Sequence, residues 1–271
     1  MFNDLKFRAS AIGQIMTNGR AKNEMGETCK SYLKTLFIEK TYGIRKEFTN
    51  KYVEKGLEVE DIAISTYSVF KGGFYTKNEQ WYTNDFLSGT PDIVSDNVID
   101  IKSSWDIYTF PHFETEIPTK GYFYQLQAYM ELTGLEDACL AYVLIDTPTQ
   151  LVEDEKRRLS WKMGMIDSEN PEYLLAVEEI ERNHSYSNIP IAKRIKEFHI
   201  KKDNQVIESI TNRTSKCAFD ATEHLTQWHI LDCAVQLSAV FENFGTSTLH
   251  NLQHVAAPQQ ELAPTLQDAV A

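Results

Sequence analysis

Two aspartates and a lysine lie close together in residues 89–103, a stretch in which apolar and charged side chains alternate. A period of two is typical of strands, and Ser95-Asp96-Asn97 in the middle predicts a tight turn. The resulting hairpin pairs Asp92 with Asp100 and places Lys102 on the same face as Asp100. Because directly opposed carboxylates repel each other, the pair predicts a cation between them.

The apolar residues of the hairpin follow the same register. It pairs Val94 with Val98 and Ile93 with Ile99, and it turns Ile93, Ile99 and Ile101 toward the face opposite the aspartates. We expect these three isoleucines to enter the core. The face with Asp92, Asp100 and Lys102, which we call the chemical face, therefore carries the ionisable groups. The other face packs into the core.

The chemical face suits a hard divalent cation. Mg²⁺ and Mn²⁺ prefer oxygen ligands and are held by one or two carboxylates together with phosphate oxygens and water, which Asp92 and Asp100 would supply. A lysine at the position of Lys102 can lower the pKa of an attacking water or stabilise charge that develops on a phosphate. The alternative is a surface hairpin whose Asp and Lys side chains are solvated or form a weak cross-strand ion pair.

A long helix is predicted over residues 46–67, before the hairpin. Gly56, Glu60, Ala63 and Tyr67 recur in it at intervals of three and four, so they share one face. Glu60 is the only acid on that face. It is either a surface residue at the edge of the stripe or a carboxylate directed at a buried cation.

Two further segments flank the hairpin. Residues 74–82 have strand character and are expected to pair with the hairpin as an antiparallel neighbour. Residues 121–133 predict a helix that ends at Gly134, and this helix puts Gln125 and Tyr129 one turn apart on one face.

The rest of the chain completes an α/β architecture. The apolar run 139–145 predicts a buried strand, parallel to the Asp100 strand through a right-handed crossover. We expect one domain over residues 1–240, with a core of about 8–146 and a helical extension of 147–240. The extension should contain helices at 151–165, 171–182 and 220–237. The composition of residues 244–271 predicts a disordered tail.

The N-terminal part predicts a helix over residues 8–16 with Ser10 as its N-cap, and a second helix over 26–42. A serine-capped helix start beside Arg8 would suit a phosphate, because its free N–H groups and the helix dipole attract anions. The alternative is a cap that serves the helix alone.

Composition excludes several classes of protein. The 271 residues are 42% hydrophobic, as in a large globular domain, and we find neither a signal peptide nor a run of about 20 apolar residues. We therefore expect a cytosolic protein. Four cysteines are scattered without CxxC or zinc-type Cys/His spacing, so we expect reduced, mostly buried thiols.

The net charge of −12 argues against a general nucleic-acid binder. Basic residues nevertheless gather in two places, residues 6–55 and 193–202. Either segment could follow a phosphate backbone, or both could be ordinary solvated surfaces interspersed with glutamates.

Four motifs in this order resemble those of the PD-(D/E)XK nuclease superfamily, and within it the lambda-exonuclease-like (YqaJ-type) phage recombination nucleases. They are Gly56-x3-Glu60-x2-Ala63-x3-Tyr67, Gly89-Thr90-Pro91-Asp92, Asp100-Ile101-Lys102 and Gln125-x3-Tyr129. The resemblance covers about residues 8–146 and implies a restriction-endonuclease-like core, a central mixed β-sheet flanked by helices. The second acid is Asp where Glu is commoner in the family, a change that many members tolerate.

The resemblance also implies roles for single residues. Asp92, Asp100 and Glu60 would surround Mg²⁺, for which Mn²⁺ can substitute, and the catalytic group would be Glu60, Asp92, Asp100 and Lys102. The residues implied to contact DNA are Arg8, Ser10, Gln125 and Tyr129.

The function implied is that of a Mg²⁺-dependent DNA exonuclease, acting 5′ to 3′ on linear duplex ends in phage-type recombination or repair, in the cytoplasm of a bacterial host. Similar enzymes work with a single-strand annealing protein and form a ring-shaped trimer, which would keep an acidic chain on its DNA. One alternative is a CRISPR-adaptation nuclease, which carries an iron–sulfur cluster on four cysteines; the cysteine spacing here argues against it. The other is a catalytically idle DNA-binding protein on the same fold.

Overall fold

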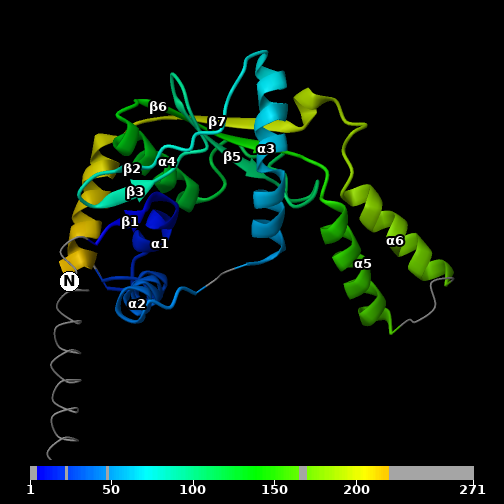
Figure 1. Ribbon diagram of the computed structural model, residues 1–271, viewed down its shortest axis with the longest axis horizontal. Coiled ribbons are helices and arrows are strands. Elements are labelled where there is room, and N and C mark those ends of the chain that lie inside the picture. The colour runs from blue at the N-terminus through cyan, green and yellow to red at the C-terminus, as the bar shows by residue number, and fades with distance from the viewer. Residues whose placement is uncertain (1–4, 22–23, 47–48, 165–169, 220–271) are drawn as a thin grey trace, which may run out of the picture. The chain divides into compact units, whose positions relative to one another are not determined.

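The computed structural model describes residues 5–21, 24–46, 49–164 and 170–219, and every element named below lies within these ranges (Figure 1). All of them belong to one compact unit, residues 1–221. The predicted helix over 220–237 and the predicted tail over 244–271 lie outside the described residues.

The main sheet has four strands in the order β4-β5-β6-β7. They are β4 (Ile93–Val94), β5 (Val98–Ser103), β6 (Asp137–Val143) and β7 (Ile195–Lys201). The β4–β5 hairpin has the predicted register, with Ile93 opposite Ile99 and Val94 opposite Val98. Strand β6 is parallel to β5 and β7 is antiparallel to β6, so the sheet is mixed as predicted.

A small second sheet has the order β1-β3-β2 and contains β1 (Phe7–Arg8), β2 (Tyr82–Thr83) and β3 (Leu87–Gly89). The predicted strand over residues 74–82 beside the hairpin is wrong. Only its last residue is in a strand, and that strand pairs with β3. Residues 77–80 are Lys-Asn-Glu-Gln, which offer no apolar alternation for a sheet to bury, and Phe74 is 90% exposed.

Among the described residues, six labelled α-helices, a further helical segment over residues 204–219 and two 3₁₀ turns accompany the sheets. The helices are α1 (Ile12–Ile15), α2 (Glu27–Tyr42), α3 (Lys51–Lys71), α4 (Lys120–Thr133), α5 (Thr149–Met163) and α6 (Pro171–Asn183). The turns are η1 (Ala9–Ala11) and η2 (Ile191–Lys193). Helix α3 begins later than the predicted residue 46 because the Asn50 side chain accepts hydrogen bonds from the backbone N–H groups of Tyr52 and Val53.

Apolar side chains fill both faces of the main sheet. On one face Val98 of β5 and Leu140 of β6 pack with Leu126 of α4, and α1 and α2 add to the same cluster. On the other face Ile99 and Ile101 pack with residues of α3. The predicted inward position of the hairpin isoleucines is confirmed, and the sheet is held between α4 and α3 (Figure 1).

The segment after Asp146 is not helical throughout. Helices α5 and α6 confirm two predictions, but β7 adds a strand to the main sheet where an all-helical extension was predicted. Its sequence, Ile-Lys-Glu-Phe-His-Ile-Lys, buries Ile195 and Phe198, which stand three apart and on opposite faces, so no period of two is visible. Residues 204–219 are helical and contribute Ile210 to the α4-side core.

In the described part of the chain, no helix combines the length and the apolar character that crossing a membrane requires.

Candidate active site

The two aspartates of the hairpin are held by different means. Asp92 lies just before β4, and its Oδ2 accepts a hydrogen bond of 2.7 Å from the backbone N–H of Ile101. Asp100 lies within β5 and is 1% exposed. Its Oδ2 forms an ion pair with the Lys102 ammonium and has no other partner among the described residues. The hairpin therefore brings the predicted Asp92, Asp100 and Lys102 into one place.

Helix α4 adds two more of the predicted residues. Gln125 Nε2 donates to Asp100 Oδ1 at 3.1 Å and to the Tyr129 hydroxyl oxygen at 3.1 Å. The Tyr129 hydroxyl in turn donates to the Thr90 carbonyl oxygen at 3.3 Å. These bonds connect α4 to the hairpin on both sides of Asp92, and they confirm that Gln125 and Tyr129 share one face.

Gly89 makes the approach of Tyr129 possible. A Cβ atom at Gly89 would lie 2.7 Å from Tyr129 Cε1 and 3.2 Å from Ala9 Cβ. Any side chain at this position would push α4 or the N-terminal turn away from the hairpin. Steric demand thus explains the glycine in the Gly89-Thr90-Pro91-Asp92 motif.

Asp92 and Asp100 are two carboxyl groups that lie close together in a largely buried environment. Burial, followed by the charge of Asp100, raises the pKa of Asp92 to about 7 against the lowering effect of Lys102. Burial alone would lower the pKa of Lys102, but the charges of Asp100 and Asp92 outweigh it and raise that pKa. Lys102 is therefore positively charged at neutral pH, whereas burial and the charge of Asp100 oppose the ionisation of Asp92.

Glu60 lies on the side of α3 that faces the hairpin. Its charge is close enough to raise the pKa of Asp92. Its Oε2 is 2.9 Å from the ammonium of Lys77, a residue that sequence reasoning missed. Lys77 belongs to the polar segment 77–80, and only the folding of that segment over α3 gives it a role, so no local pattern could have indicated it.

The N-terminal prediction needs a correction. Ser10 is not a helix N-cap; it is an exposed residue inside the turn η1, whose start has no side-chain cap. The reason is that β1 pairs with β3 as far as Arg8, so the turn begins only at Ala9. Arg8 is near Glu39 of α2, with Nη2 to Oε2 3.9 Å. Although no described contact links Arg8 or Ser10 to the aspartates, Ala9 between them packs near Gly89.

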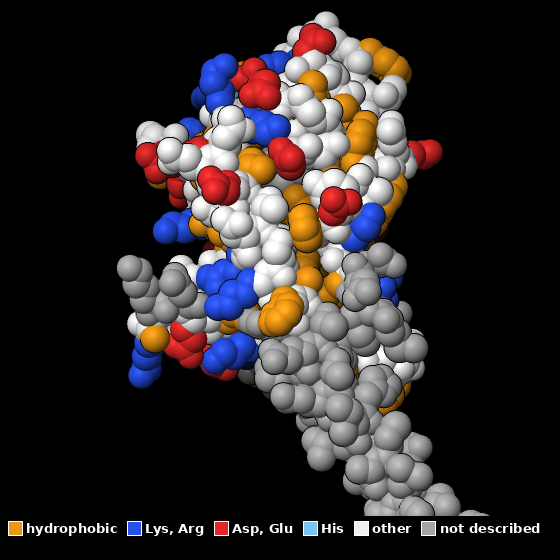
Figure 2. Space-filling view, turned by 90° about the vertical axis from the view of Figure 1, so that its left-hand side faces the viewer, with side chains coloured by type: hydrophobic (Ala, Val, Ile, Leu, Met, Phe, Trp, Pro, Cys, Tyr) orange, Lys and Arg blue, Asp and Glu red, His pale blue; other side chains and the backbone are white. Residues whose placement is uncertain are grey.

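Many of the basic residues expected to follow DNA are already paired. Lys30 contacts Glu24 and Glu27, Arg45 contacts Glu39, and Lys202 contacts Glu131. Figure 2 shows basic and acidic side chains interspersed on the described surface of the face it presents. No continuous strip of positive charge is visible among the described residues of that face.

The described cysteines do not come together as four cluster ligands would. Cys29 and Cys217 have their sulfur atoms 3.7 Å apart on the α4 side of the core, whereas Cys139 lies in the α3-side cluster. Cys233 is outside the described residues. The described part of the chain therefore gives no support to an iron–sulfur nuclease.

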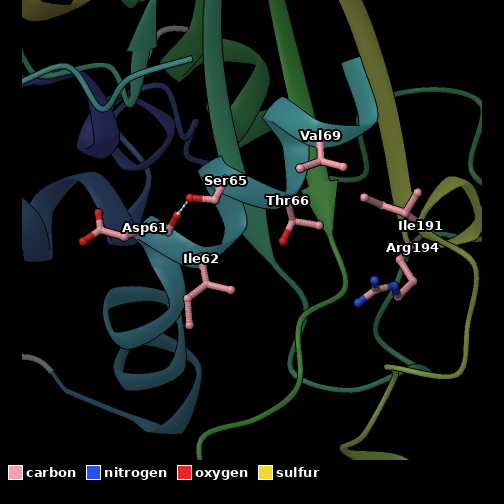
Figure 3. Close-up of a pocket in the computed structure, with 7 residues that line it drawn as sticks. All are labelled: Asp61, Ile62, Ser65, Thr66, Val69, Ile191 and Arg194. Carbon is pink, nitrogen blue, oxygen red and sulfur yellow. Dashed lines mark hydrogen bonds between the residues drawn. The ribbon is translucent and has the colours of Figure 1, made fainter. Parts of the chain in front are cut away.

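A surface pocket of about 400 Å³ lies elsewhere, between the outer face of α3 and η2 (Figure 3). Arg194 and hydroxyls of α3 line it together with Ile62, Val69 and Ile191. None of the predicted site residues lines this pocket. The candidate active site is instead the polar face of the hairpin around Asp92, Asp100 and Lys102.

Comparison with known proteins agrees with this fold. No protein-family model matches the sequence, and no curated protein matches it significantly. A phage related exonuclease from Haemophilus somnus 129PT has a similar structure, with a TM-score of 0.67 and 27% identity over 83% of this chain and 97% of that chain. An alkaline exonuclease from Laribacter hongkongensis, LHK-Exo, aligns with a TM-score of 0.59 and 16% identity over 86% of this chain and 96% of that chain.

The same LHK-Exo in complex with dAMP gives a TM-score of 0.58 and 18% identity, over 85% of this chain and 94% of that chain. At these identities the LHK-Exo likeness concerns the fold, while the Haemophilus enzyme is similar in sequence as well. Nearly the whole length of each neighbour is covered, so the likeness extends beyond a shared sheet. The structural likeness agrees with the resemblance of the motifs to lambda-exonuclease-like (YqaJ-type) members of the PD-(D/E)XK superfamily, and it supports a nuclease of the phage exonuclease type.

Proposed function

We propose that this protein is a Mg²⁺-dependent exonuclease that degrades linear double-stranded DNA from its ends, 5′ to 3′, in phage-type recombination or repair. One observation carries the proposal. An ion pair and hydrogen bonds join Asp100, Lys102, Gln125 and Tyr129 across β5 and α4, and the backbone N–H of Ile101 holds Asp92 beside them. A surface hairpin with solvated charges would not hold its acids in this way.

The donor set fits a hard divalent cation. Asp92 and Asp100 would hold the ion, with Glu60 completing its surroundings directly or through water. The raised pKa of Asp92 supports this assignment, because a bound cation would offset the repulsion that makes its ionisation unfavourable. When bound, Mg²⁺ would polarise the phosphodiester and lower the pKa of an attacking water.

The residues around the acids would orient the reaction. Lys102, kept cationic by its two acidic neighbours, would stabilise negative charge that develops on the phosphate. Gln125 fixes one oxygen of Asp100 and leaves the other toward Lys102. Tyr129 holds Gln125 in place and ties the helix to Thr90. Arg8 and Ser10 would contact the DNA backbone or its terminal phosphate.

Digestion of linear and circular duplex DNA by the purified protein tests the proposal. We expect linear DNA to be degraded in Mg²⁺ or Mn²⁺, circular DNA to survive, and a chelator to stop the reaction. Substrates labelled at the 5′ or 3′ end give the polarity, with early loss of the 5′ label expected. Binding without degradation would instead support an idle DNA-binding protein, and cleavage of circular DNA would support an endonuclease.

The assembly follows from the same resemblance. We propose that three chains close into a ring around the DNA and that a single-strand annealing protein receives the exposed strand. A cytosolic location stays a prediction from the sequence.

A further inference from the structure

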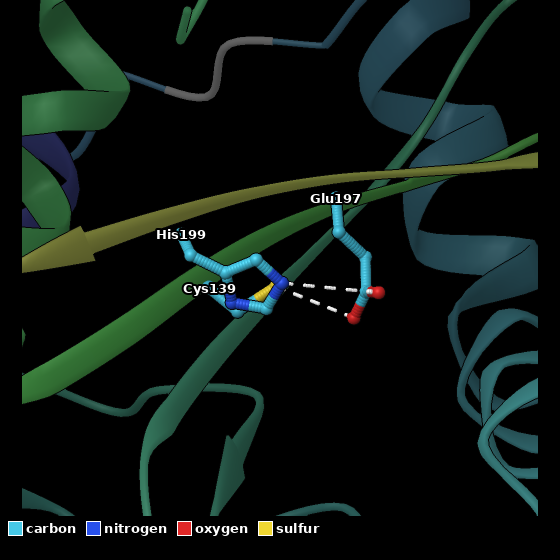
Figure 4. Close-up of side chains that lie close together, drawn as sticks. All are labelled: Cys139, Glu197 and His199. Carbon is cyan, nitrogen blue, oxygen red and sulfur yellow. Dashed lines mark hydrogen bonds and ion pairs between the residues drawn. The ribbon is translucent and has the colours of Figure 1, made fainter.

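Cys139, Glu197 and His199 form a second chemical cluster, on the sheet face opposite Asp100 (Figure 4). The strand register creates it. Cys139 of β6 stands directly opposite His199 of β7, and Glu197 is two residues earlier on β7, so all three side chains share one face. That face also carries Ile99 and packs on α3. The sulfur, a ring nitrogen and a carboxylate oxygen all lie within 4.8 Å of one another.

We infer that this cluster is a binding site for a borderline transition-metal ion such as Zn²⁺, separate from the proposed Mg²⁺ site. Thiolate, imidazole and carboxylate together are a donor set that Zn²⁺ accepts and Mg²⁺ does not favour. Three protein ligands would leave a fourth, tetrahedral position for water. Tetrahedral zinc with bonds of about 2.0–2.3 Å places its ligand atoms about 3.3–3.8 Å apart, so only a small closure of the cluster is needed.

The separations that involve Glu197 already lie near this range. Cys139 Sγ is 3.7 Å from Glu197 Oε1, and His199 Nε2 is 3.8 Å from Glu197 Oε2. Cys139 is buried within the sheet, which fixes the sulfur, whereas the His199 side chain is 63% exposed and can adjust. The cluster thus combines one rigid ligand with one adaptable ligand and an opening to solvent.

The carboxylate of Glu197 is oriented from behind by α3. The Tyr67 hydroxyl donates to Oε1 at 2.6 Å, a partner of the kind that aligns ligating carboxylates in metal sites. Lys71 donates to both oxygens, at 3.1 and 3.3 Å. Its ammonium would compete with the ion, and because this lysine is the last residue of α3 with a partly exposed side chain, it can turn to solvent when metal binds. The Cys139 thiol would release its proton to solvent on binding.

Cobalt is the probe for this site, because a thiolate bound to Co²⁺ gives a near-ultraviolet charge-transfer absorption. We expect the chelator-treated, full-length protein to show this absorption at one Co²⁺ per chain, with displacement by Zn²⁺ and not by excess Mg²⁺. Asp92→Asn should keep the absorption, which separates this site from the nuclease centre.

Variants then decide the ligands. Cys139→Ala should remove the absorption, and His199→Ala, an exposed change that leaves the core intact, should weaken binding at least about tenfold. The matched control His112→Ala changes a histidine of the 105–120 loop and should have no effect. Lys71→Met should strengthen binding by removing the competing cation. The inference is overturned if the absorption is absent, if it persists in Cys139→Ala, or if His199→Ala binds Co²⁺ as tightly as the parent protein.

Discussion

Asp92 accepts a backbone hydrogen bond from Ile101 and lies within the fields of both Asp100 and Lys102. We predict that Asp92→Ala and Lys102→Ala each lower the rate of DNA degradation in Mg²⁺ at least about a hundredfold, because each removes charge from the proposed reacting centre. Circular dichroism should show that both variants fold. Asp96→Ala, in the exposed turn of the same hairpin, is the matched control and should keep full activity. A variant at Asp92 or Lys102 that retained more than a few per cent of the normal rate would contradict the assignment.

The raised pKa of Asp92 also predicts a pH-dependent stability. The folded-state pKa of Asp92 is about 7, whereas its ordinary value is 3.8. Its contribution to the free energy of unfolding is therefore fully present below pH 3.8, falls as the pH rises, and is lost above pH 7. Asp92→Asn removes that loss. We expect Asp92→Asn to raise the Tm at pH 8 by about 2–4 °C for each kcal/mol gained in the free energy of unfolding. The effect at pH 5 should be smaller.

Thermal unfolding in a chelator, with the parent protein measured at the same two pH values, checks this prediction. Adding Mg²⁺ should reduce or reverse the gain in Tm of Asp92→Asn, because the ion stabilises the parent protein more than the variant, which has lost one ligand charge. An equal shift at both pH values would mean that Asp92 is not under electrostatic strain.

At the scale of elements, α1 and α4 pack with their backbones in contact. A Cβ atom at Gly13 would lie 2.5 Å from the Gly121 Cα, whereas a Cβ at Gly121 would meet nothing within 4 Å. We therefore predict that Gly13→Ala destabilises the protein by about 1–3 kcal/mol, because the added methyl group would not fit between the two helices. Gly121→Ala, a change of the same size, should be neutral or stabilise α4 by up to about 1 kcal/mol. Urea unfolding of both variants measures the difference, and equal effects would contradict this packing.

Helix α3 carries Glu60 toward the hairpin, where Lys77 now neutralises it. We predict that a crystal structure with Mn²⁺ or Ca²⁺ shows the Glu60 carboxylate within reach of the ion, directly or through one water, with Lys77 turned away. The physical reason is that a divalent cation beside Asp92 attracts the carboxylate and repels the ammonium. If Glu60 still points at Lys77 or at bulk solvent in that structure, its place in the metal site is wrong.

At the scale of the whole molecule, a net charge of −12 gives little attraction to DNA, and the described basic residues are largely interspersed with acids. A closed ring would retain the substrate without strong attraction. We predict light-scattering mass near three times the single-chain 31.1 kDa, together with processive digestion of long DNA. A mass near that of one chain with distributive digestion would remove the ring and leave the active-site proposal untouched.

The features that the sequence determined by itself are those set by near neighbours in the chain. The hairpin register follows from alternation around a three-residue turn, and the end of α4 follows from Gly134, which adopts a positive φ of 75°. The proximity of Asp92, Asp100 and Lys102 is a consequence of that local geometry. The parallel strand β6 was also predictable, because a continuous apolar run indicates a strand that is buried on both faces.

Other features were decided only by tertiary structure, because they join residues far apart in the chain. The pairing of Lys77 with Glu60 depends on how a polar loop crosses α3, and β7 depends on an open edge of β6 that accepts its backbone. Cys139 and His199 meet only through that strand register. Backbone groups make the hydrogen bonds at a sheet edge, whatever the side chains are. A short stretch of sequence therefore does not indicate which distant strand will pair with that edge.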